Sequence, residues 1–473
     1  MASESTKSTL RLRPGEQLAL LMFGDLFMAA LAFLAGIYYW SVGDKWLKFS
    51  LEFFRARVDA WYYLLPFAWM LLLIEIYDLH RAASWSRTVR AVVFAAVVGG
   101  IPYLLVYFTS SDPERINRRA VVVFIVLAAL LTLIWRRLYI TMYRSQGNLR
   151  RVLVVGAGGN GRTLAEIYKM LNPPPFNLVA YIDDDPDKIG KEVEGFRILA
   201  GSDKLLRLID EMNITEIIVA ITGEMQGETF QILLDVQESG TEIVRMPTLY
   251  EELLGRVPIH HLESDWVIRS FVDEARSSSF LEFGQRLLDI FGSIVGLVIM
   301  LVLLPFLAIA IIIDSGLPIF YWQERLGRGG REFQIVKFRT MRQDAEKEGQ
   351  PQMAGENDPR VTRVGNFMRI TRLDEFPQFW NVLRGEMSIV GPRAERAQWV
   401  ATFQKEIPFY RARLLVKPGI TGWAQINYGY ASTVQHTSVK LEYDLYYIKH
   451  RSMIMNIVII LRTIGTVLSR KGR

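Results

Sequence analysis

The stretch RLLDIFGSIVGLVIMLVLLPFLAIAIIIDSG, residues 286–316, holds an uninterrupted run of uncharged residues between Asp289 and Asp314. The run is longer than the roughly 20 residues that a helix needs to cross the hydrocarbon core of a bilayer. Pro305 stands near its middle, where a proline removes one backbone hydrogen bond and clashes with the preceding turn. We therefore predict an apolar membrane helix that kinks or breaks at Pro305.

The residues that follow this helix indicate on which side of the membrane it ends. If the helix simply crossed, the segment from residue 315 onward would be exported, and its many cations oppose export under the positive-inside bias. We therefore expect a re-entrant helix that enters and leaves on the cytoplasmic face. A kinked span with a sixth crossing at 452–468 is the alternative, but Arg462 in that last segment suits the membrane interface better. The cations are Arg325, Arg328, Arg331, Lys337, Arg339 and Arg342.

The composition of the whole chain is that of a membrane protein. Of the 473 residues 51% are hydrophobic, and these residues are gathered into long blocks. A net charge of +6 would suit a nucleic acid or an anionic membrane surface, and the apolar blocks favour the membrane, so we expect no nucleic-acid partner. The chain has no Cys, which excludes disulfides, thiol nucleophiles and Cys-ligated zinc.

Four further apolar blocks precede residue 148, and we predict that they form a four-helix transmembrane bundle over residues 1–148. Lys and Arg are more frequent at the N-terminus, in the second loop and after the last block than in the other loops, which places both ends of the bundle in the cytoplasm. No small-residue cleavage site follows the first block, so we interpret it as a retained anchor. The blocks are residues 17–40, 58–79, 91–109 and 120–139.

Residues 149–255 alternate short β-branched runs with helical patterns, which predicts a Rossmann-like domain with a parallel sheet. A G-x-G-x-x-G motif follows the first strand, and an acid stands at the end of the next one, as in dinucleotide-binding folds. The candidate residues for binding an unidentified nucleotide are Gly156, Gly158, Gly161 and Asp183. Because the region is short and no Tyr-x-x-x-Lys pair follows it, a domain that only regulates or dimerises is the alternative. Residues 256–284 are predicted to be a linker.

The stretch LDEFPQFWNVLRGEMSIVGPR, residues 373–393, places two neighbouring acids, Asp374 and Glu375, among several arginines. Because Pro377 belongs in the first turn of a helix, we expect Asp374 at or near the N-cap, where the helix dipole keeps it ionised as a nucleophile or metal ligand. Arg369 and Arg393 could converge on the same point and bind phosphate oxygens. A simple helix cap with surface salt bridges is the alternative.

Residues 284–473 resemble the bacterial polyprenyl-phosphate sugar-1-phosphate transferases, membrane enzymes that start exopolysaccharide, capsule or O-antigen repeat units. The four-span bundle and the Rossmann-like domain upstream are similar to the large branch of that family. The resembling segments are the helix from Arg286 with its Pro305 break, YWQERLGRGGREFQIVKFRTM (321–341), NDPRVTRVGNFMRITRLDEFPQFWNVLRGEMSIVGPR (357–393), KPGITGWAQIN (417–427) and EYDLYYIKH (442–450).

The resemblance implies a mechanism and a set of site residues. Asp374 would attack the β-phosphorus of a UDP-sugar, release UMP and carry the sugar phosphate until undecaprenyl phosphate accepts it. Glu375 would assist as metal ligand or proton acceptor, and the two carboxylates would hold Mg²⁺ or Mn²⁺. The substrate phosphates would be bound by Arg369, Arg393, Lys337 and Arg339.

The resemblance also implies a mainly α-helical catalytic domain over residues 285–473 on the cytoplasmic face of the bacterial inner membrane, and we expect a homodimer. UDP-glucose or UDP-galactose is the expected donor. Two positions depart from the family pattern: Arg372 stands where Ser is usual, and Ala394 where Pro is usual.

Two other functions remain open at the level of the sequence. The chain could be a membrane-anchored NAD-dependent nucleotide-sugar dehydratase or epimerase, against which the missing Tyr-x-x-x-Lys pair argues. It could also be a non-catalytic scaffold for polysaccharide assembly, which would release no UMP from a UDP-sugar.

Overall fold

A computed structural model describes residues 14–44, 46–77, 82, 84–109, 118–143, 149–172, 174–221, 225, 227–261, 279–342, 345, 358–429 and 433–468. The chain divides into two compact units, which are considered separately below. The first comprises Met1–Ile221 and Met225–Val244, and the second comprises Thr222–Glu224 and Arg245–Arg473.

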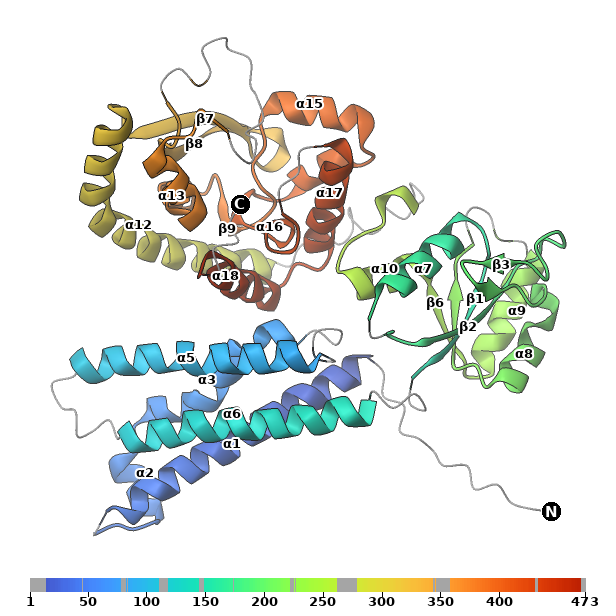
Figure 1. The fold of residues 1–473 in the computed structure, drawn as a ribbon, viewed down its shortest axis with the longest axis horizontal. Coiled ribbons are helices and arrows are strands. Elements are labelled where there is room, and N and C mark those ends of the chain that lie inside the picture. Colours follow the sequence, from blue (N-terminus) through green and yellow to red (C-terminus); the bar gives the residue numbers. More distant parts are fainter. Residues whose placement is uncertain are drawn as a thin grey trace. The chain divides into compact units, whose positions relative to one another are not determined.

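The first unit begins with a bundle in which α1, α3, α5 and α6 pack against one another (Figure 1). Its outward faces carry large apolar side chains such as Phe23, which is 69% exposed, as lipid-facing helices do. The elements are α1 (Pro14–Val42), α2 (Leu51–Arg57), η1 (Ala60–Leu64), α3 (Leu65–Leu72), η2 (Ile74–Ile76), α5 (Trp85–Thr109) and α6 (Arg118–Tyr143).

Three helices in the described part of the chain are long and apolar enough to cross a membrane: Glu16–Val42, Arg119–Met142 and Ser279–Ser315. The block at 58–79 was expected to form one continuous span, and the structure corrects this. The apolar helix runs only over Ala60–Leu72, because Leu73, with φ/ψ of −86° and 0°, leaves the helical conformation. This stretch is shorter than the roughly 20 residues that a helix needs to cross the hydrocarbon core.

A buried ion pair joins the first and last helices of the bundle. Arg136 Nη2 lies 2.6 Å from Asp25 Oδ2, and the two side chains are 1% and 0% exposed. Arg136 Nη1 also donates to the carbonyl of Ile76. Because an unpaired charge is costly in an apolar bundle, this pair is expected to set the register of α1 against α6.

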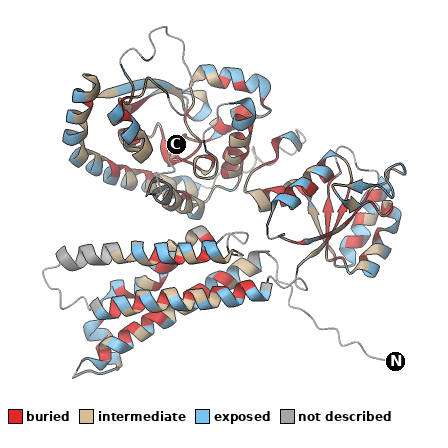
Figure 2. Ribbon diagram, viewed as in Figure 1, coloured by how far each residue is buried: buried red, intermediate tan, exposed pale blue. Residues whose placement is uncertain are grey.

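The rest of the first unit is an α/β domain with a four-stranded sheet in the order β2-β1-β5-β6. Strand β1 pairs in parallel with β2 and with β5, as the sequence predicts, and Figure 2 shows the buried residues gathered in the sheet. The elements are β1 (Arg151–Val155), α7 (Gly159–Met170), β2 (Asn177–Ile182), β3 (Glu192–Val193), β4 (Phe196–Arg197), η5 (Ser202–Lys204), α8 (Leu205–Met212), β5 (Glu216–Val219), α9 (Gly227–Glu238) and β6 (Glu242–Arg245).

The second unit is mainly helical, with an antiparallel β7–β8 hairpin and a short parallel β9–β10 pair. Its elements are α10 (Met246–Leu254), η6 (Ile259–His261), α12 (Ser279–Ser315), β7 (Phe320–Leu326), η8 (Arg328–Gly330), β8 (Glu332–Phe338), α13 (Arg363–Thr371), η9 (Leu373–Glu375), α14 (Gln378–Arg384), β9 (Ser388–Val390), α15 (Ala397–Glu406), η10 (Tyr410–Leu415), β10 (Gly419–Thr421), α16 (Trp423–Asn427), α17 (Val434–Lys449) and α18 (Met453–Leu468).

Helix α12 contains Pro305 and is bent, as Figure 1 shows. Near its start, Asp289 Oδ1 accepts hydrogen bonds from Ser388 Oγ and the Ile389 amide, both at 2.9 Å. Near its end, Asp314 Oδ2 accepts the Val364 amide at 2.8 Å. Half of the side chains between these two anchors are exposed, and all of the exposed ones are apolar. The same domain therefore holds both ends of the apolar helix.

Residues 245–261 pack on α17 within the second unit. The Tyr250 hydroxyl donates to Glu442 Oε2 at 3.1 Å, and the Val257 amide donates to the Glu442 carbonyl at 3.0 Å. Glu251 pairs with Lys449 at 3.1 Å. The described start of the predicted linker is thus packed against the domain, and its residues 262–278 lie outside the described part of the chain.

Glu442 allows a test of this packing through pH. Burial raises the pKa of Glu442 to about 7, although Arg256 and the Tyr250 hydroxyl act to lower it. The Arg256 guanidinium also lies over the ring of Tyr443. An acid whose pKa is higher in the folded than in the unfolded chain contributes stability at low pH that is lost as the pH rises toward 7.

We therefore expect Glu442→Gln to unfold at a higher temperature than the wild type at pH 8, with a gain of about 1–3 kcal/mol, and to lose that gain at pH 5. Thermal unfolding in detergent at the two pH values measures the difference. An advantage of the variant that is equal at both pH values would contradict the buried-charge interpretation.

Candidate active site

The two neighbouring acids lie in a buried turn between helices α13 and α14. Arg372 ends α13 in the left-handed conformation, with φ 56° and ψ 19°, and its amide donates to the Arg369 carbonyl. The chain then forms the 3₁₀ turn η9 before Pro377, the N-cap of α14. Asp374 is 9% and Glu375 is 7% exposed, so both carboxylates leave bulk water together.

The expected N-cap role of Asp374 is wrong in its local geometry. The cap position of α14 is occupied by Pro377, three residues later, and no side chain caps that helix end. Proline at the cap begins the helix without a side-chain acceptor, and Asp374 is left in the preceding turn. Its ionisation is therefore governed by burial and neighbouring charges instead of the helix dipole.

Glu375 is held by two cations. Arg393 Nη1 and Nη2 both donate to Glu375 Oε1 at 3.0 Å, and Lys337 Nζ lies 3.6 Å from the same oxygen. Burial works to raise the pKa of Glu375, but Arg393 and then Lys337 oppose it and lower the pKa to about 2. Glu375 therefore carries its negative charge across the whole physiological pH range.

The pKa of Asp374 is shifted in the opposite direction. Burial, followed by the negative charge of Glu375, raises its pKa to about 6. Its side chain makes no hydrogen bond or ion pair with any residue that the structure describes. At neutral pH it is mainly ionised and carries a poorly solvated negative charge, which is the state of an activated carboxylate.

Asp374 is exceptional among the buried acids of the described residues. Each of the others has an ion pair or hydrogen bonds to its carboxylate, although burial still raises the pKa of Glu442 to about 7 and that of Asp444 to about 6. Buried charges are normally paired in this way, so an unpaired one marks a candidate functional group. The paired acids are Asp25, Glu216, Glu251, Asp289, Glu375, Glu442 and Asp444.

The structure brings three of the four predicted phosphate-binding cations to these acids. Lys337, Arg369 and Arg393 all lie close enough to lower the pKa of Asp374, and Arg369 Nε also donates to Thr340 Oγ1 at 3.0 Å. For Arg339 the structure shows a different contact, since its Nη1 donates to the Gly316 carbonyl at 3.4 Å, just after α12. Its phosphate-binding role stays a prediction.

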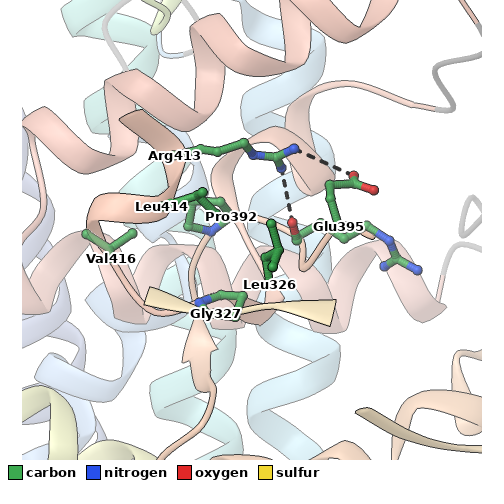
Figure 3. A pocket seen from close by; sticks show the side chains of 9 residues that line it. Leu326, Gly327, Pro392, Glu395, Arg413, Leu414 and Val416 are labelled. Carbon is green, nitrogen blue, oxygen red and sulfur yellow. Dashed lines mark hydrogen bonds and ion pairs between the residues drawn. The ribbon is translucent and has the colours of Figure 1, made fainter. Parts of the chain in front are cut away.

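Sequence reasoning missed a second layer of charges behind Arg393. Arg413 and Glu395 line a small pocket beside Pro392, shown in Figure 3, and Arg413 also pairs with Asp444 at 2.9 Å. Asp444 belongs to the EYDLYYIKH segment, in which it stands between an aromatic and an aliphatic residue. That pattern was the one signal in the sequence that could have predicted a buried acid here. A buried helix face with one acid usually needs a buried cation from elsewhere in the chain.

A divalent cation fits the chemistry of the two carboxylates. No group of three or more His, Cys, Asp or Glu side chains suited to a metal exists among the described residues. Mg²⁺ does not require one, because it is commonly bound through one or two carboxylates together with substrate phosphates and waters. Asp374, whose carboxylate has no partner in the described part of the chain, supplies such an oxygen ligand.

The glycine motif of the α/β domain also comes together as predicted. Gly156 has φ +106°, and a side chain on Gly161 would collide with the Gly156 carbonyl, whereas one on Gly158 would meet open space. Asp183 Oδ2 accepts the Ala157 amide at 2.7 Å, and its Oδ1 lies 3.2 Å from Lys188 Nζ. Asp183 therefore closes the loop, and its role toward a nucleotide stays a prediction.

Comparison with known proteins identifies two matching families. Residues 280–470 match the family described as "Bacterial sugar transferase", and residues 73–247 match the family described as "CoA-binding domain".

Individual relatives are similar over larger parts of the chain. A UDP-glucose:undecaprenyl-phosphate glucose-1-phosphate transferase of Xanthomonas campestris pv. campestris is 31% identical, over 70% of each chain. A UDP-galactose-lipid carrier transferase of Erwinia amylovora is 32% identical, over 68% of this chain and 69% of the relative. A UDP-N-acetylgalactosamine-undecaprenyl-phosphate N-acetylgalactosaminephosphotransferase of Aeromonas hydrophila is 38% identical over 53% of this chain, and the match spans only 57% of that relative.

The pairing of Glu375 predicts how the turn responds to the loss of Arg393. In Arg393→Met, Glu375 keeps only Lys337, and we expect a loss of about 1–3 kcal/mol in unfolding free energy because a buried carboxylate loses its closest cation. Arg384→Met is the matched control, since that side chain is 57% exposed and its ion pair should contribute less than about 1 kcal/mol. Thermal unfolding compares the two variants, and equal losses would show that Arg393 does not stabilise the turn.

Proposed function

This chain belongs to the bacterial sugar transferases that use undecaprenyl phosphate, and from that premise we propose that it transfers a sugar-1-phosphate from a UDP-sugar to undecaprenyl phosphate. The transfer proceeds through a covalent aspartyl-phosphosugar at Asp374 and starts exopolysaccharide, capsule or O-antigen synthesis. The observation that carries this proposal is the unpaired, buried carboxylate of Asp374 beside a charge-neutralised Glu375.

The proposed chemistry consists of two displacements at one phosphorus atom. A carboxylate oxygen of Asp374 attacks the β-phosphorus of the UDP-sugar, the bond between that phosphorus and the bridging oxygen breaks, and UMP leaves with the electron pair. A phosphate oxygen of undecaprenyl phosphate then attacks the same phosphorus and releases the Asp374 carboxylate. Each step exchanges one phosphorus–oxygen bond for another, so no oxidant, reductant or net proton source is needed.

The cations around the turn suit this transfer. Phosphoryl transfer depends chiefly on positioning and on positive charge near the phosphoryl oxygens. Lys337, Arg369 and Arg393 surround Asp374, and the Arg393 side chain is 41% exposed, so it remains accessible to a ligand while it holds Glu375. Mg²⁺ or Mn²⁺ bound by Asp374 and Glu375 would neutralise the diphosphate and improve UMP as a leaving group.

The anchoring of α12 supports the re-entrant topology. Its two ends contact the same domain through Asp289 and Asp314, whereas a crossing helix would present its ends to opposite sides of the membrane. The catalytic unit then lies on the cytoplasmic face of the inner membrane, where a lipid-linked acceptor phosphate is available. A homodimer is expected, and the α/β domain is proposed to be Rossmann-like and to bind a nucleotide.

The relatives' names mention glucose, galactose and N-acetylgalactosamine, so the donor class is a UDP-hexose or UDP-N-acetylhexosamine. A panel of these donors with Mg²⁺ and polyprenyl phosphate, scored by UMP release, identifies the sugar. The absence of UMP from every donor would favour the scaffold alternative, and nicotinamide retained in stoichiometric amount by the purified protein would favour the dehydratase alternative.

Asp374→Asn tests the nucleophile. We expect UMP release to fall below detection, because an amide cannot form the acyl phosphate. The unfolding temperature at pH 8 should be equal to or higher than that of the wild type, because Asn removes a buried charge whose pKa is raised by burial. Wild-type protein incubated with the donor without lipid should gain the mass of the sugar phosphate on the peptide that contains Asp374. Turnover retained by Asp374→Asn would refute the assignment, as would an unmodified peptide in an active preparation.

Cysteine labelling tests the topology, since the chain is free of thiols. We expect Ser315→Cys to react with a membrane-impermeant maleimide only when the cytoplasmic face is accessible, as in inverted vesicles. Glu52→Cys, in the predicted first periplasmic loop, is the control that should react from the opposite face. Labelling of Ser315→Cys from the periplasmic face would overturn the re-entrant helix.

A further inference from the structure

The turn that carries Arg393 is held from behind by buried charges. It runs from Gly391 to Glu395, directly after β9, and the Gly391 amide donates to the Thr421 carbonyl at 2.9 Å. The Gly419 amide donates to the Pro392 carbonyl, also at 2.9 Å. The next two carbonyls of the turn, those of Arg393 and Ala394, accept hydrogen bonds from two different guanidinium groups.

Arg413 holds the first of these carbonyls. Its side chain is 7% exposed, and Nη2 donates to the Arg393 carbonyl at 3.1 Å and to Asp444 Oδ2 at 2.9 Å. Its Nη1 donates to the Tyr410 hydroxyl at 2.7 Å. The planar fork of the guanidinium spreads its donors over two nitrogens that face different partners, whereas the three donors of a lysine ammonium sit on one compact nitrogen.

Arg325 holds the second carbonyl. Its Nη1 donates to the Ala394 carbonyl at 3.2 Å, and the side chain is 17% exposed. Glu395 lies between the two arginines: its Oε2 is 3.7 Å from Arg325 and its Oε1 is 3.7 Å from Arg413 (Figure 3 shows the Arg413 side).

The contacts of this group are made within the protein. Arg325 faces Glu395, and Arg413 faces both Glu395 and Asp444. Lys440 is a third cation near the same two acids. Arg393 differs, because its backbone carbonyl belongs to this group while its side chain points to Glu375. The group therefore acts on the backbone of the turn, whereas the Arg393 guanidinium is free of that task and faces Glu375.

We propose that Arg413, with Arg325 and Glu395, is a positioning residue that clamps the backbone of the Gly391–Glu395 turn so that the Arg393 guanidinium faces Glu375. The group is called the guanidinium clamp below. Its link to catalysis rests on the proposed function, whereas its effect on the turn does not.

The first experiment measures the turn itself, without substrate. Arg413→Lys keeps a positive charge beside Asp444 but loses the fork, so the domain should stay folded while the turn loosens. We expect hydrogen exchange of the segment 388–396 to accelerate on the order of tenfold or more in this variant, because local opening becomes easier. Glu395→Gln should act in the same direction, and Arg411→Gln, an exposed arginine on the same η10 segment, should leave exchange unchanged. Unchanged exchange in Arg413→Lys and Glu395→Gln would overturn the clamp.

The second experiment asks whether Arg413 acts through Arg393. UMP release is measured for the wild type, Arg413→Lys, Arg393→Lys and the double variant, since a double-mutant cycle reports coupling between two residues. We expect Arg413→Lys to lower kcat/KM on the order of 10- to 100-fold in the wild-type background, because small misplacements of a positioning group are costly. In the Arg393→Lys background the same change should cost less than about twofold.

A purely structural role for Arg413 would lower activity by the same factor in both backgrounds, and that result would overturn the positioning role. The proposed function fails separately, if the wild type releases no UMP from any donor. In that case the exchange measurement alone decides whether the clamp exists.

Discussion

Asp374 and Glu375 are neighbouring carboxylates in one buried turn, and they repel each other. The charges around the turn determine how each carboxylate bears that repulsion. Arg393 and Lys337 neutralise Glu375 and hold its pKa near 2. Asp374 receives no hydrogen bond from the described residues, and its pKa rises to about 6. Glu375 is therefore a permanent anion that orients the cations around it. Asp374 is a poorly solvated carboxylate, which suits attack on a phosphorus atom that carries negative oxygens.

This arrangement depends on contacts made far from the turn in the sequence. Arg393 donates to Glu375, and the backbone of its own turn accepts hydrogen bonds from Arg325 and Arg413. Helix α12 is tied at both ends to the domain that carries the charged turn. A site that must meet both a water-soluble nucleotide sugar and a lipid phosphate requires this combination, since neither substrate can enter the other's phase.

The sequence and the structure agree on some elements and differ on others for identifiable reasons. The parallel strands of the α/β domain and the apolar helix through Pro305 follow from short-range patterns, and both are present. The span predicted at 58–79 is broken at Leu73, where no pattern signalled a helix end. The N-cap expected at Asp374 is taken by Pro377, because residue type alone does not place the last residue before a helix.

By itself the sequence determined the chemical groups of this protein: two adjacent acids, several arginines, an apolar helix interrupted by proline, and a glycine motif after a strand. These are local properties, and neighbours along the chain are enough to show them. Only the tertiary structure decided that Glu375 takes the cations while Asp374 stays unpaired, that Arg339 donates to Gly316, and that Arg413 and Asp444 stand behind Arg393. The reason is that pairing and burial depend on the distances in space between segments that are separated along the chain, and the linear order of residues does not contain those distances.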